Sequence, residues 1–138
     1  MRTTKKIPNL VIAAIFCLVI SSCEKPPGPG GRATIKGKLH AKNFDAYAMT
    51  VISEYDIAGE NVYICYGSDA TARNNIKTSY DGSFEFMYLN KGHYKIFAVS
   101  RDTSIHIKKS EKTIPVMVEI DINSINQTVD VGEIVINN

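Results

Sequence analysis

The sequence predicts an all-β protein, a single antiparallel Greek-key β-sandwich of about seven strands within residues 32–138. Three observations lead to this fold class. From Arg32 onward, apolar and polar residues alternate with a period of two, and turn residues interrupt the alternation regularly. Beyond the N-terminal segment, no window carries a convincing apolar stripe of 3.6-residue period. A sheet that no helix covers buries its apolar face against another sheet.

The alternation places a first strand at residues 33–39, with threonine and lysine side chains on its solvated face. Residues 61–66 are apolar on both faces, which predicts a central strand. Three later strands are expected at residues 93–99, 114–120 and 129–136.

A hairpin is expected in the middle of the chain. Asp81-Gly82 is a strong short hairpin signal, and it separates two strands expected at residues 76–80 and 83–88. Phe84 and Phe86 are expected to face the core, with the glutamate between them facing solvent.

Two features of the pattern are less regular. Residues 41–58 fit no clear period, and the part from Phe44 to Tyr55 is too long for a bare loop. We expect an extra edge strand or a single helical turn there. Gly132 interrupts the last expected strand and is a candidate β-bulge.

The N-terminus has the layout of a secretory signal. Arg2, Lys5 and Lys6 precede an apolar run at residues 10–20, and two serines follow. A helix of that run covers only about 16 Å, whereas a hydrocarbon core is about 30 Å thick. The run is therefore too short to cross a bilayer, and we expect residues 1–22 to be a cleaved signal peptide.

Residues 19–23, Val-Ile-Ser-Ser-Cys, resemble the lipobox of bacterial lipoproteins. The resemblance implies that Cys23 receives lipid, that the signal is cut before it, and that the mature chain is held to a membrane. It places the protein in the bacterial cell envelope, at the outer membrane, facing either the periplasm or the surface. Each methylene buried in the bilayer contributes about 0.8 kcal/mol to membrane binding. Two or three acyl chains therefore anchor a protein stably, whereas a single chain binds only weakly.

The segment after the cysteine predicts a tether. Residues 24–31 carry three prolines and three glycines and no large apolar side chain. We expect residues 23–31 to form a lipidated, flexible tether that does not pack and that lifts the domain off the bilayer.

Charge excludes one class of partner. Removing residues 1–22 takes away three basic residues and no acidic one, which leaves 13 basic and 14 acidic residues and a net charge of about −1. A near-neutral domain lacks the basic surface of a nucleic-acid-binding protein, so no nucleic-acid partner is expected.

A second resemblance concerns the folded part. Residues 78–86 and 89–96 resemble the hairpin pattern of carboxypeptidase regulatory-like and prealbumin-like (transthyretin-like) β-sandwich domains. The resemblance implies the same fold, and it says little about function because such domains serve many proteins. The hydroxyisourate hydrolases share this fold and end in Tyr-Arg-Gly-Ser, whereas the present sequence ends in Glu-Ile-Val-Ile-Asn-Asn at residues 133–138. The resemblance to these enzymes therefore extends only to the architecture. The matching positions are Thr78, Asp81, Gly82, Phe84, Phe86, Leu89, Gly92 and Tyr94.

No residue set predicts catalysis or a cofactor. His40, His93 and His106 are far apart in sequence and lack a second ligand at metal spacing, so they are expected at the surface. Cys65, the one cysteine left inside the domain, is expected to be a buried small hydrophobe. The loop aspartates could share one end of the sandwich, but they lack the run of ligands that calcium needs; they are Asp69, Asp81 and Asp102.

These observations lead to one preferred function and two alternatives. The preferred hypothesis is a non-enzymatic, lipid-anchored β-sandwich of the cell envelope that acts as an interaction or structural module, with residues 67–75 and 100–112 as its expected contact surfaces. The second is an accessory glycan-binding lipoprotein that uses Tyr47 or Tyr55, and the third is a hydrolase for which no residues can be nominated. The basic side chains at Lys108, Lys109 and Lys112 are expected to form a solvated loop.

Overall fold

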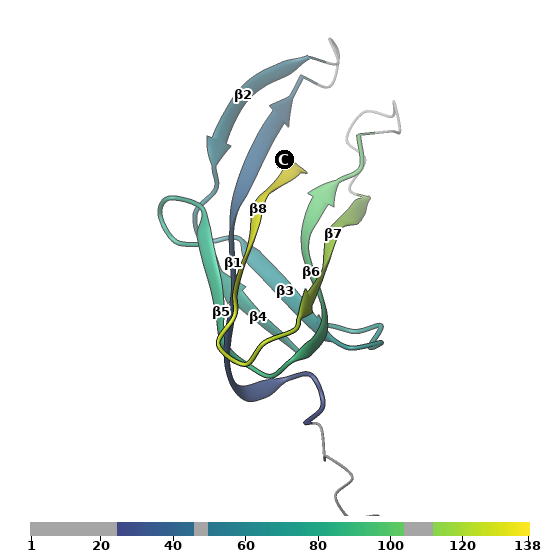
Figure 1. Ribbon diagram of the computed structural model, residues 1–138. Coiled ribbons are helices and arrows are strands. Elements are labelled where there is room, and N and C mark those ends of the chain that lie inside the picture. The colour runs from purple at the N-terminus through teal and green to yellow at the C-terminus, as the bar shows by residue number, and fades with distance from the viewer. Residues whose placement is uncertain (1–24, 46–49, 104–111) are drawn as a thin grey trace, which may run out of the picture.

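The computed structural model describes residues 25–45, 50–103 and 112–138. In them the chain forms eight strands and no helix, arranged as two facing sheets, which confirms the all-β sandwich (Figure 1). None of these residues belongs to a helix that could cross a membrane. The expected signal peptide, the lipid site at Cys23 and four further residues named above lie outside the described part: Tyr47, His106, Lys108 and Lys109.

The first sheet, sheet A, is built around the long strand β1 (Pro29–Phe44). β5 (Ser83–Leu89) pairs with the first half of β1, and β2 (Val51–Asp56) pairs with its last residues along the same edge. β8 (Thr128–Asn137) runs along the other edge of β1. The β1–β8 pair is parallel, whereas we expected an antiparallel sandwich throughout; the other described pairs are antiparallel.

The second sheet, sheet B, has the strand order β4-β3-β6-β7. Its strands are β3 (Asn61–Tyr66), β4 (Asn74–Lys77), β6 (Gly92–Arg101) and β7 (Thr113–Ile122). The expectation that residues 61–66 form a central strand is confirmed, because β3 lies between β4 and β6.

The core lies between the two sheets. Because successive side chains of a strand point to opposite faces, a strand that borders the core contributes about every second residue, whereas the edge strand β2 is exposed along its whole length. Phe84 and Phe86 are both 4% exposed, and Glu85 between them is exposed, as expected. The fully enclosed side chains from the two sheets include Ile35, Leu39 and Ile134 on one side and Val62, Ile64, Tyr94 and Ile96 on the other.

The turn at Asp81-Gly82 forms, but it does not close a hairpin. The Ser79 amide donates to the Ser83 carbonyl at 2.8 Å, and Asp81 accepts bonds from both the amide and the hydroxyl of Ser83, which lowers the pKa of Asp81. The strand before the turn, β4, pairs with β3, whereas β5 pairs with β1. The expected hairpin is therefore wrong, since the chain passes from one sheet to the other here.

Thr78 accounts for that crossing. Its buried hydroxyl donates to the Ile57 carbonyl at 2.6 Å and accepts a bond from the Glu60 amide at 3.0 Å. Both partners precede β3, so Thr78 is fixed beside that segment and the chain leaves sheet B directly after β4. A buried hydroxyl that is satisfied in this way avoids the cost of an unpaired polar group.

The two regions with an irregular sequence pattern form an edge strand and a β-bulge. Within the ambiguous segment, residues 51–56 form the edge strand β2, which confirms the strand alternative for the described residues. The bulge at Gly132 is confirmed, because the β1–β8 register shifts between Lys36 and Lys38 and Gly132 has a positive φ of 71°.

The sandwich begins earlier than expected. β1 starts at Pro29, and Gly28 is buried, with its amide donating to the Tyr94 hydroxyl at 2.9 Å. The Asn90 side-chain amide donates to the carbonyls of Pro26 and Pro29, each at 3.2 Å. The expectation that this tether does not pack is thus wrong for residues 26–31. A segment without large side chains still offers backbone groups, and these are what the domain binds.

Candidate functional site

The outer face of sheet A carries the densest group of charged side chains in the described residues. In β1, Leu39 and Ala41 face the core, so the side chains that alternate with them face solvent. The strands on either side of β1 contribute acidic residues to the same face. We call this group the sheet A lattice: Lys36, Lys38, His40 and Lys42 from β1, Glu54 and Asp56 from β2, and Asp130 and Glu133 from β8.

His40 lies at the centre of the lattice. Its Nδ1 lies 2.9 Å from an Asp56 oxygen and 3.5 Å from Glu133, and its Nε2 lies 3.5 Å from Glu54. The lysines extend the network outward. Lys38 is 3.3 Å from Asp56, Lys42 is 3.3 Å from Glu54 and Lys36 is 3.7 Å from Asp130.

The bulge at Gly132 makes this arrangement possible. Asp130 and Glu133 are three residues apart, so in a regular strand they would face opposite sides of the sheet. The extra residue on β8 brings Asp130 and Glu133 to the same face of the sheet. Asp130 then lies beside Lys36, and Glu133 lies beside His40. The bulge thus converts two acidic residues of β8 into members of one surface.

The contacts within the lattice shift the pKa values of His40, Asp56 and Glu54. The hydrogen bond with Asp56 raises the pKa of His40, with further contributions from Glu133 and Glu54, while partial burial opposes the shift. The pKa of Asp56 is lowered, mainly by His40 and then by Lys38. The pKa of Glu54 is lowered, mainly by Lys42. The contacts therefore favour a protonated imidazole between ionised carboxylates.

The same residues have the composition of a metal site. One ligand atom each from His40, Asp56 and Glu133 lie within 4.8 Å of one another. A cation would need His40 in its neutral form, because a protonated imidazole has no free lone pair. The raised pKa of His40 opposes that form, and Lys38 already neutralises Asp56. The described geometry thus fits an ion-pair network better than a metal centre.

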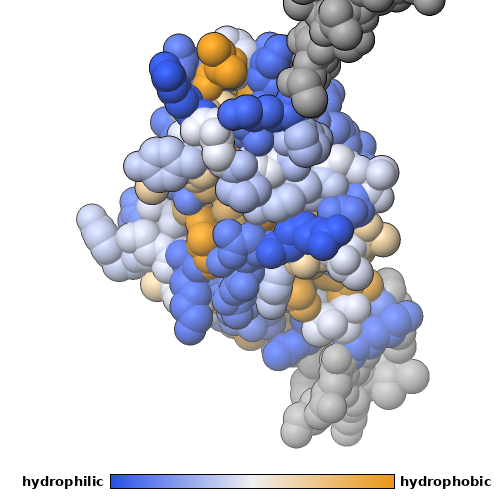
Figure 2. All heavy atoms as spheres, turned by 90° about the horizontal axis from the view of Figure 1, so that it is seen from below, coloured by the Kyte–Doolittle hydropathy of each residue, from blue (hydrophilic) through white to orange (hydrophobic). Residues whose placement is uncertain are grey.

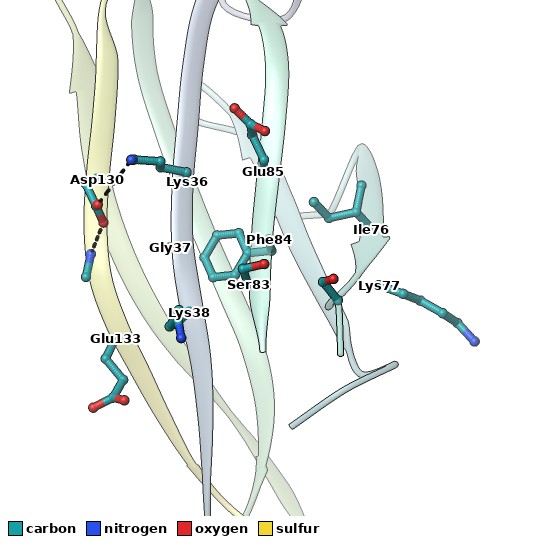
Figure 3. A pocket seen from close by; sticks show the side chains of 12 residues that line it. Lys36, Gly37, Lys38, Ile76, Lys77, Ser83, Phe84, Glu85, Asp130 and Glu133 are labelled. Atoms are coloured by element: carbon teal, nitrogen blue, oxygen red, sulfur yellow. Dashed lines mark hydrogen bonds and ion pairs between the residues drawn. The ribbon is translucent and has the colours of Figure 1, made fainter. Parts of the chain in front are cut away.

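A hollow of about 890 Å³ adjoins the lattice (Figure 3). Lys36, Lys38 and Asp130 stand at one side of it, Ser83 and Glu85 of β5 stand in the middle, and Lys77 of β4 stands beyond them. Its lining therefore offers both hydrogen-bond donors and acceptors.

Gly37 and Phe84 form the buried inner wall of the hollow. Because Gly37 has no side chain, the Phe84 ring lies directly against the β1 backbone there. A Cβ at Gly37 would stand 2.8 Å from the Phe84 Cζ and 2.6 Å from a Val131 methyl group, which is closer than atoms pack. Any larger residue at position 37 would thus displace the ring.

The outer face of sheet B differs. Tyr63, Phe97 and Met117 are neighbours across β3, β6 and β7, and the rings of Tyr63 and Phe97 stack at 5.0 Å with 14° between their planes. Val99, 37% exposed, follows on β6. We call these four residues the sheet B stripe. Since the two rings stack, each covers one face of the other.

The other expected site residues are dispersed. His93 binds Asp121 at 2.8 Å on the outer face of sheet B, far from the sheet A lattice. Cys65 is a free thiol, 3% exposed, as a small hydrophobe would be. Tyr55, the described candidate for sugar binding, is 40% exposed, and its hydroxyl accepts a bond from Asn138.

The three loop aspartates do not share an end of the sandwich. Asp69 follows β3 and pairs with Arg73 at 2.7 Å, whereas Asp102 follows β6 and lies 3.7 Å from Lys112. Because β3 and β6 are antiparallel, their carboxyl ends lie at opposite ends of sheet B. The idea that these residues meet is therefore wrong, and Asp81 is engaged in its own turn.

Sequence reasoning missed the sheet A lattice. His40 and Asp56 are 16 residues apart, and Glu133 comes from the last strand, so no local spacing links them. The sequence analysis expected His40 at the surface, just beyond a first strand that was expected to end at residue 39, and the structure extends that strand through His40. Only the pairing of β1 with β2 and β8 brings the acidic partners beside it.

Comparison with known proteins adds little. No protein-family model matches the chain, and no curated protein matches it. Its fold is similar to a crystal structure described as a candidate carbohydrate-binding protein of Pseudomonas aeruginosa, with 12% identity over 99% of this chain and 100% of that one and a TM-score of 0.45.

A second similar structure is a 9R-lipoxygenase from Cyanothece, with 13% identity over 93% of this chain and a TM-score of 0.34. The present chain spans 20% of the lipoxygenase chain.

Proposed function

We propose that this chain is a non-enzymatic, lipid-anchored binding module of the bacterial cell envelope, held at the outer membrane through Cys23. The observation that carries the proposal is the sheet A lattice. Its cations and carboxylates are held in fixed positions on three paired strands, beside an open hollow with donors and acceptors. A rigid surface of this kind suits recognition of a charged or hydroxyl-rich partner.

The state of the titratable groups supports binding over catalysis. A general base at neutral pH requires a neutral imidazole, and the contacts of His40 with Asp56 and Glu133 favour the protonated form. A nucleophilic cysteine requires access to substrate, and Cys65 is buried. Buried side-chain polar atoms in the described residues all have hydrogen-bond partners, which is the condition of a stable scaffold.

The lipid anchor in this proposal rests on the sequence. The apolar run before Cys23 is too short to span a bilayer, and the residues around Cys23 resemble a lipobox. The first test is fractionation of cells that express the full precursor. The parent chain should sediment with membranes and the Cys23→Ser variant should not; equal retention of both would remove the anchor.

The binding surface is tested by crosslinking in intact envelopes. The parent should recover a defined partner, and the double variant Lys36→Glu, Lys38→Glu should lose most of it, because both charges beside the hollow are reversed. Lys77→Glu is the matched control, since Lys77 belongs to the same hollow but extends away from the lattice in Figure 3. Equal recovery by all three proteins, or recovery of no partner, would argue against this surface.

One observation favours the glycan-binding alternative. The hollow combines hydroxyl, ammonium and carboxylate groups with the partly exposed, apolar side chain of Ile76, and polyhydroxylated ligands use both kinds of contact. A glycan array probed with the mature domain should then show binding that Ser83→Ala weakens, because Ser83 lines the hollow. Tyr55→Ala tests the earlier tyrosine hypothesis separately. A blank array would eliminate this alternative.

A further inference from the structure

The segment that leads to the anchor is fastened to the sandwich. The Tyr94 hydroxyl accepts a bond from the Gly28 amide at 2.9 Å and donates to the Asn90 carbonyl at 2.8 Å. The Asn90 side chain holds the carbonyls of Pro26 and Pro29. The β5–β6 turn and the segment 26–29 therefore form one unit at the end of the sandwich where β1 begins (Figure 1).

Pro27 closes the contact. Gly92, with a φ of 137°, opens β6 directly beneath it, and a Cβ there would stand only 2.5 Å from the Pro27 ring. Gly67, directly after the neighbouring strand β3, also lies near the ring, since a Cβ there would stand 3.8 Å from the Pro27 Cγ. The absence of a side chain at Gly92 thus lets the proline ring lie against the sheet end.

The remaining chain between the sandwich and Cys23 is very short. Pro26 is held by Asn90, and Lys25 is the first described residue. From Lys25 to Cys23 there are two peptide units, which span at most about 7 Å when fully extended. A lipid on Cys23 would thus bring the bilayer surface to this end of the sandwich, whatever path those residues take.

The surface at this end suits a polar membrane interface. A hollow of about 520 Å³ is lined by Lys25, Lys91 and Asn123 together with Pro26, Pro27, Gly92 and Ile122, and no acidic residue is among these described lining residues. Lysine ammonium groups bind lipid phosphates, and each adds about 1 kcal/mol at an anionic surface. Seen from this end in Figure 2, the molecule is mainly hydrophilic, with separate apolar patches.

Two exposed large side chains lie at this end of the sandwich, one near the end of β5 and one in the β7–β8 turn. Tyr88, beside the β5–β6 turn, is 67% exposed, and Ile125, in the β7–β8 turn, is 57% exposed. By alternation after Phe84 and Phe86, Tyr88 should point inward, but its φ of +61° turns it outward at the register shift between β5 and β1. A tyrosine held outward at some backbone cost, next to lysines, fits the headgroup region of a bilayer.

We infer that this end of the sandwich, formed by residues 25–28 and the β5–β6 and β7–β8 turns, rests directly on the bilayer surface. The sandwich is then clamped to the membrane, with its long axis rising from it, and the opposite end with the C-terminus points away. This inference rests on the proposed lipid anchor at Cys23. It replaces the expectation of a tether that lifts the domain.

The test uses the mature, lipid-modified protein in vesicles of phosphatidylethanolamine and phosphatidylglycerol, with a nitroxide quencher on the lipid headgroups. Single fluorophores are attached through Asn123→Cys, at the proposed contact end, and through Tyr80→Cys, beyond the other end of β5. Cys65 is buried, so it should not compete for the label. The two sites are separated by at least the length of β5, about 20 Å.

The label at position 123 should lose most of its fluorescence, and the label at position 80 should lose little. A ten-residue Gly/Ser insertion between residues 24 and 25 should leave vesicle binding intact and abolish the difference between the labels. Equal quenching at the two positions without the insertion would overturn the inference.

Failure of the anchor itself gives a different result. If the Cys23→Ser variant floated with the vesicles as fully as the lipidated protein, the proposed anchor and the clamped arrangement would both fall. If only the lipidated protein floated but its two labels were quenched equally, the anchor would stand and only the clamped arrangement would be rejected.

Discussion

The two outer faces of the sandwich are built from strands of the same alternating pattern, yet they carry different chemistry. On sheet A, basic side chains occupy the central strand β1, and carboxylates flank it from β2 and β8. On sheet B, the middle of the face is the apolar stripe of Tyr63, Phe97, Met117 and Val99. Its ion pairs, such as His93 with Asp121, lie toward one end.

This difference indicates that different interactions contribute to stability on the two faces. Exposed ion pairs contribute little to stability and respond to pH and salt, whereas an aromatic contact contributes through buried area and responds to neither. We therefore expect the sheet B stripe to support the fold and the sheet A lattice to define a surface. The variants below test that division, from the largest expected effect to the smallest.

Phe97→Ala should have the largest effect on the free energy of unfolding. Phe97 is partly buried and stacks on Tyr63, and truncation would remove both the stack and its buried area. A loss of about 2 kcal/mol is expected, below the range for fully buried phenylalanines. Urea denaturation measures it. Val99→Ala in the same stripe is the control and should cost less than about 1 kcal/mol; equal costs would contradict a supporting role for the ring stack.

Gly132→Ala should come second, with a loss of about 1 kcal/mol from the left-handed backbone that the bulge requires. Gly59→Ala is the matched control, because Gly59 has a φ of 73° against 71° for Gly132, and a Cβ at either site meets open space. Both variants should lose similar stability in thermal denaturation. Only Gly132→Ala should alter the pH profile, since only that bulge orients Glu133 toward His40; identical profiles would refute this role.

His40→Gln should have the smallest effect on stability at neutral pH but should reshape its dependence on pH. Because the folded-state pKa of His40 is raised, its contribution is complete below the unfolded-state value and is lost as the pH rises through the raised value. The lowered pKa values of Asp56 and Glu54 act in the opposite sense, so their contribution is lost as the pH falls through them.

The parent should thus be most stabilised by the lattice in the mildly acidic range between these transitions, where His40 is protonated and the carboxylates are ionised. Melting temperatures measured from pH 4 to pH 9 should show a decline as the pH rises through the raised pKa of His40, and His40→Gln should remove that decline. His93→Gln is the control from the other face. A parent and variant that decline in parallel would show that the lattice does not hold the charge on His40.

Much of the fold could be predicted because its signals are local. The inward orientation of Phe84 and Phe86, the central place of residues 61–66 and the bulge at Gly132 all follow from alternation or from a single residue type. The Asp81-Gly82 turn was local as well. The pairing of the two strands that flank this turn was not a local property. It depends on the contact of the Thr78 hydroxyl with the Ile57 carbonyl and on the pairing of β5 with β1.

The candidate site and the start of the domain could not be predicted in the same way. The acidic partners of His40 lie on β2 and β8, and a sequence pattern contains no register between strands. The prolines and glycines after Cys23 indicated a loose tether, since their side chains cannot form a core. The structure binds them through backbone groups instead, which composition does not report.

The sequence by itself determined the fold class, because alternation and turn residues act over a few positions. It also supplied the argument for the anchor, because that argument depends only on the length of an apolar run and on the cysteine after it. The tertiary structure alone decided which charges meet on sheet A, how β5 leaves its turn and how closely the N-terminal segment is held. Each of these depends on contacts between residues far apart in the chain, which exist only once the strands have paired.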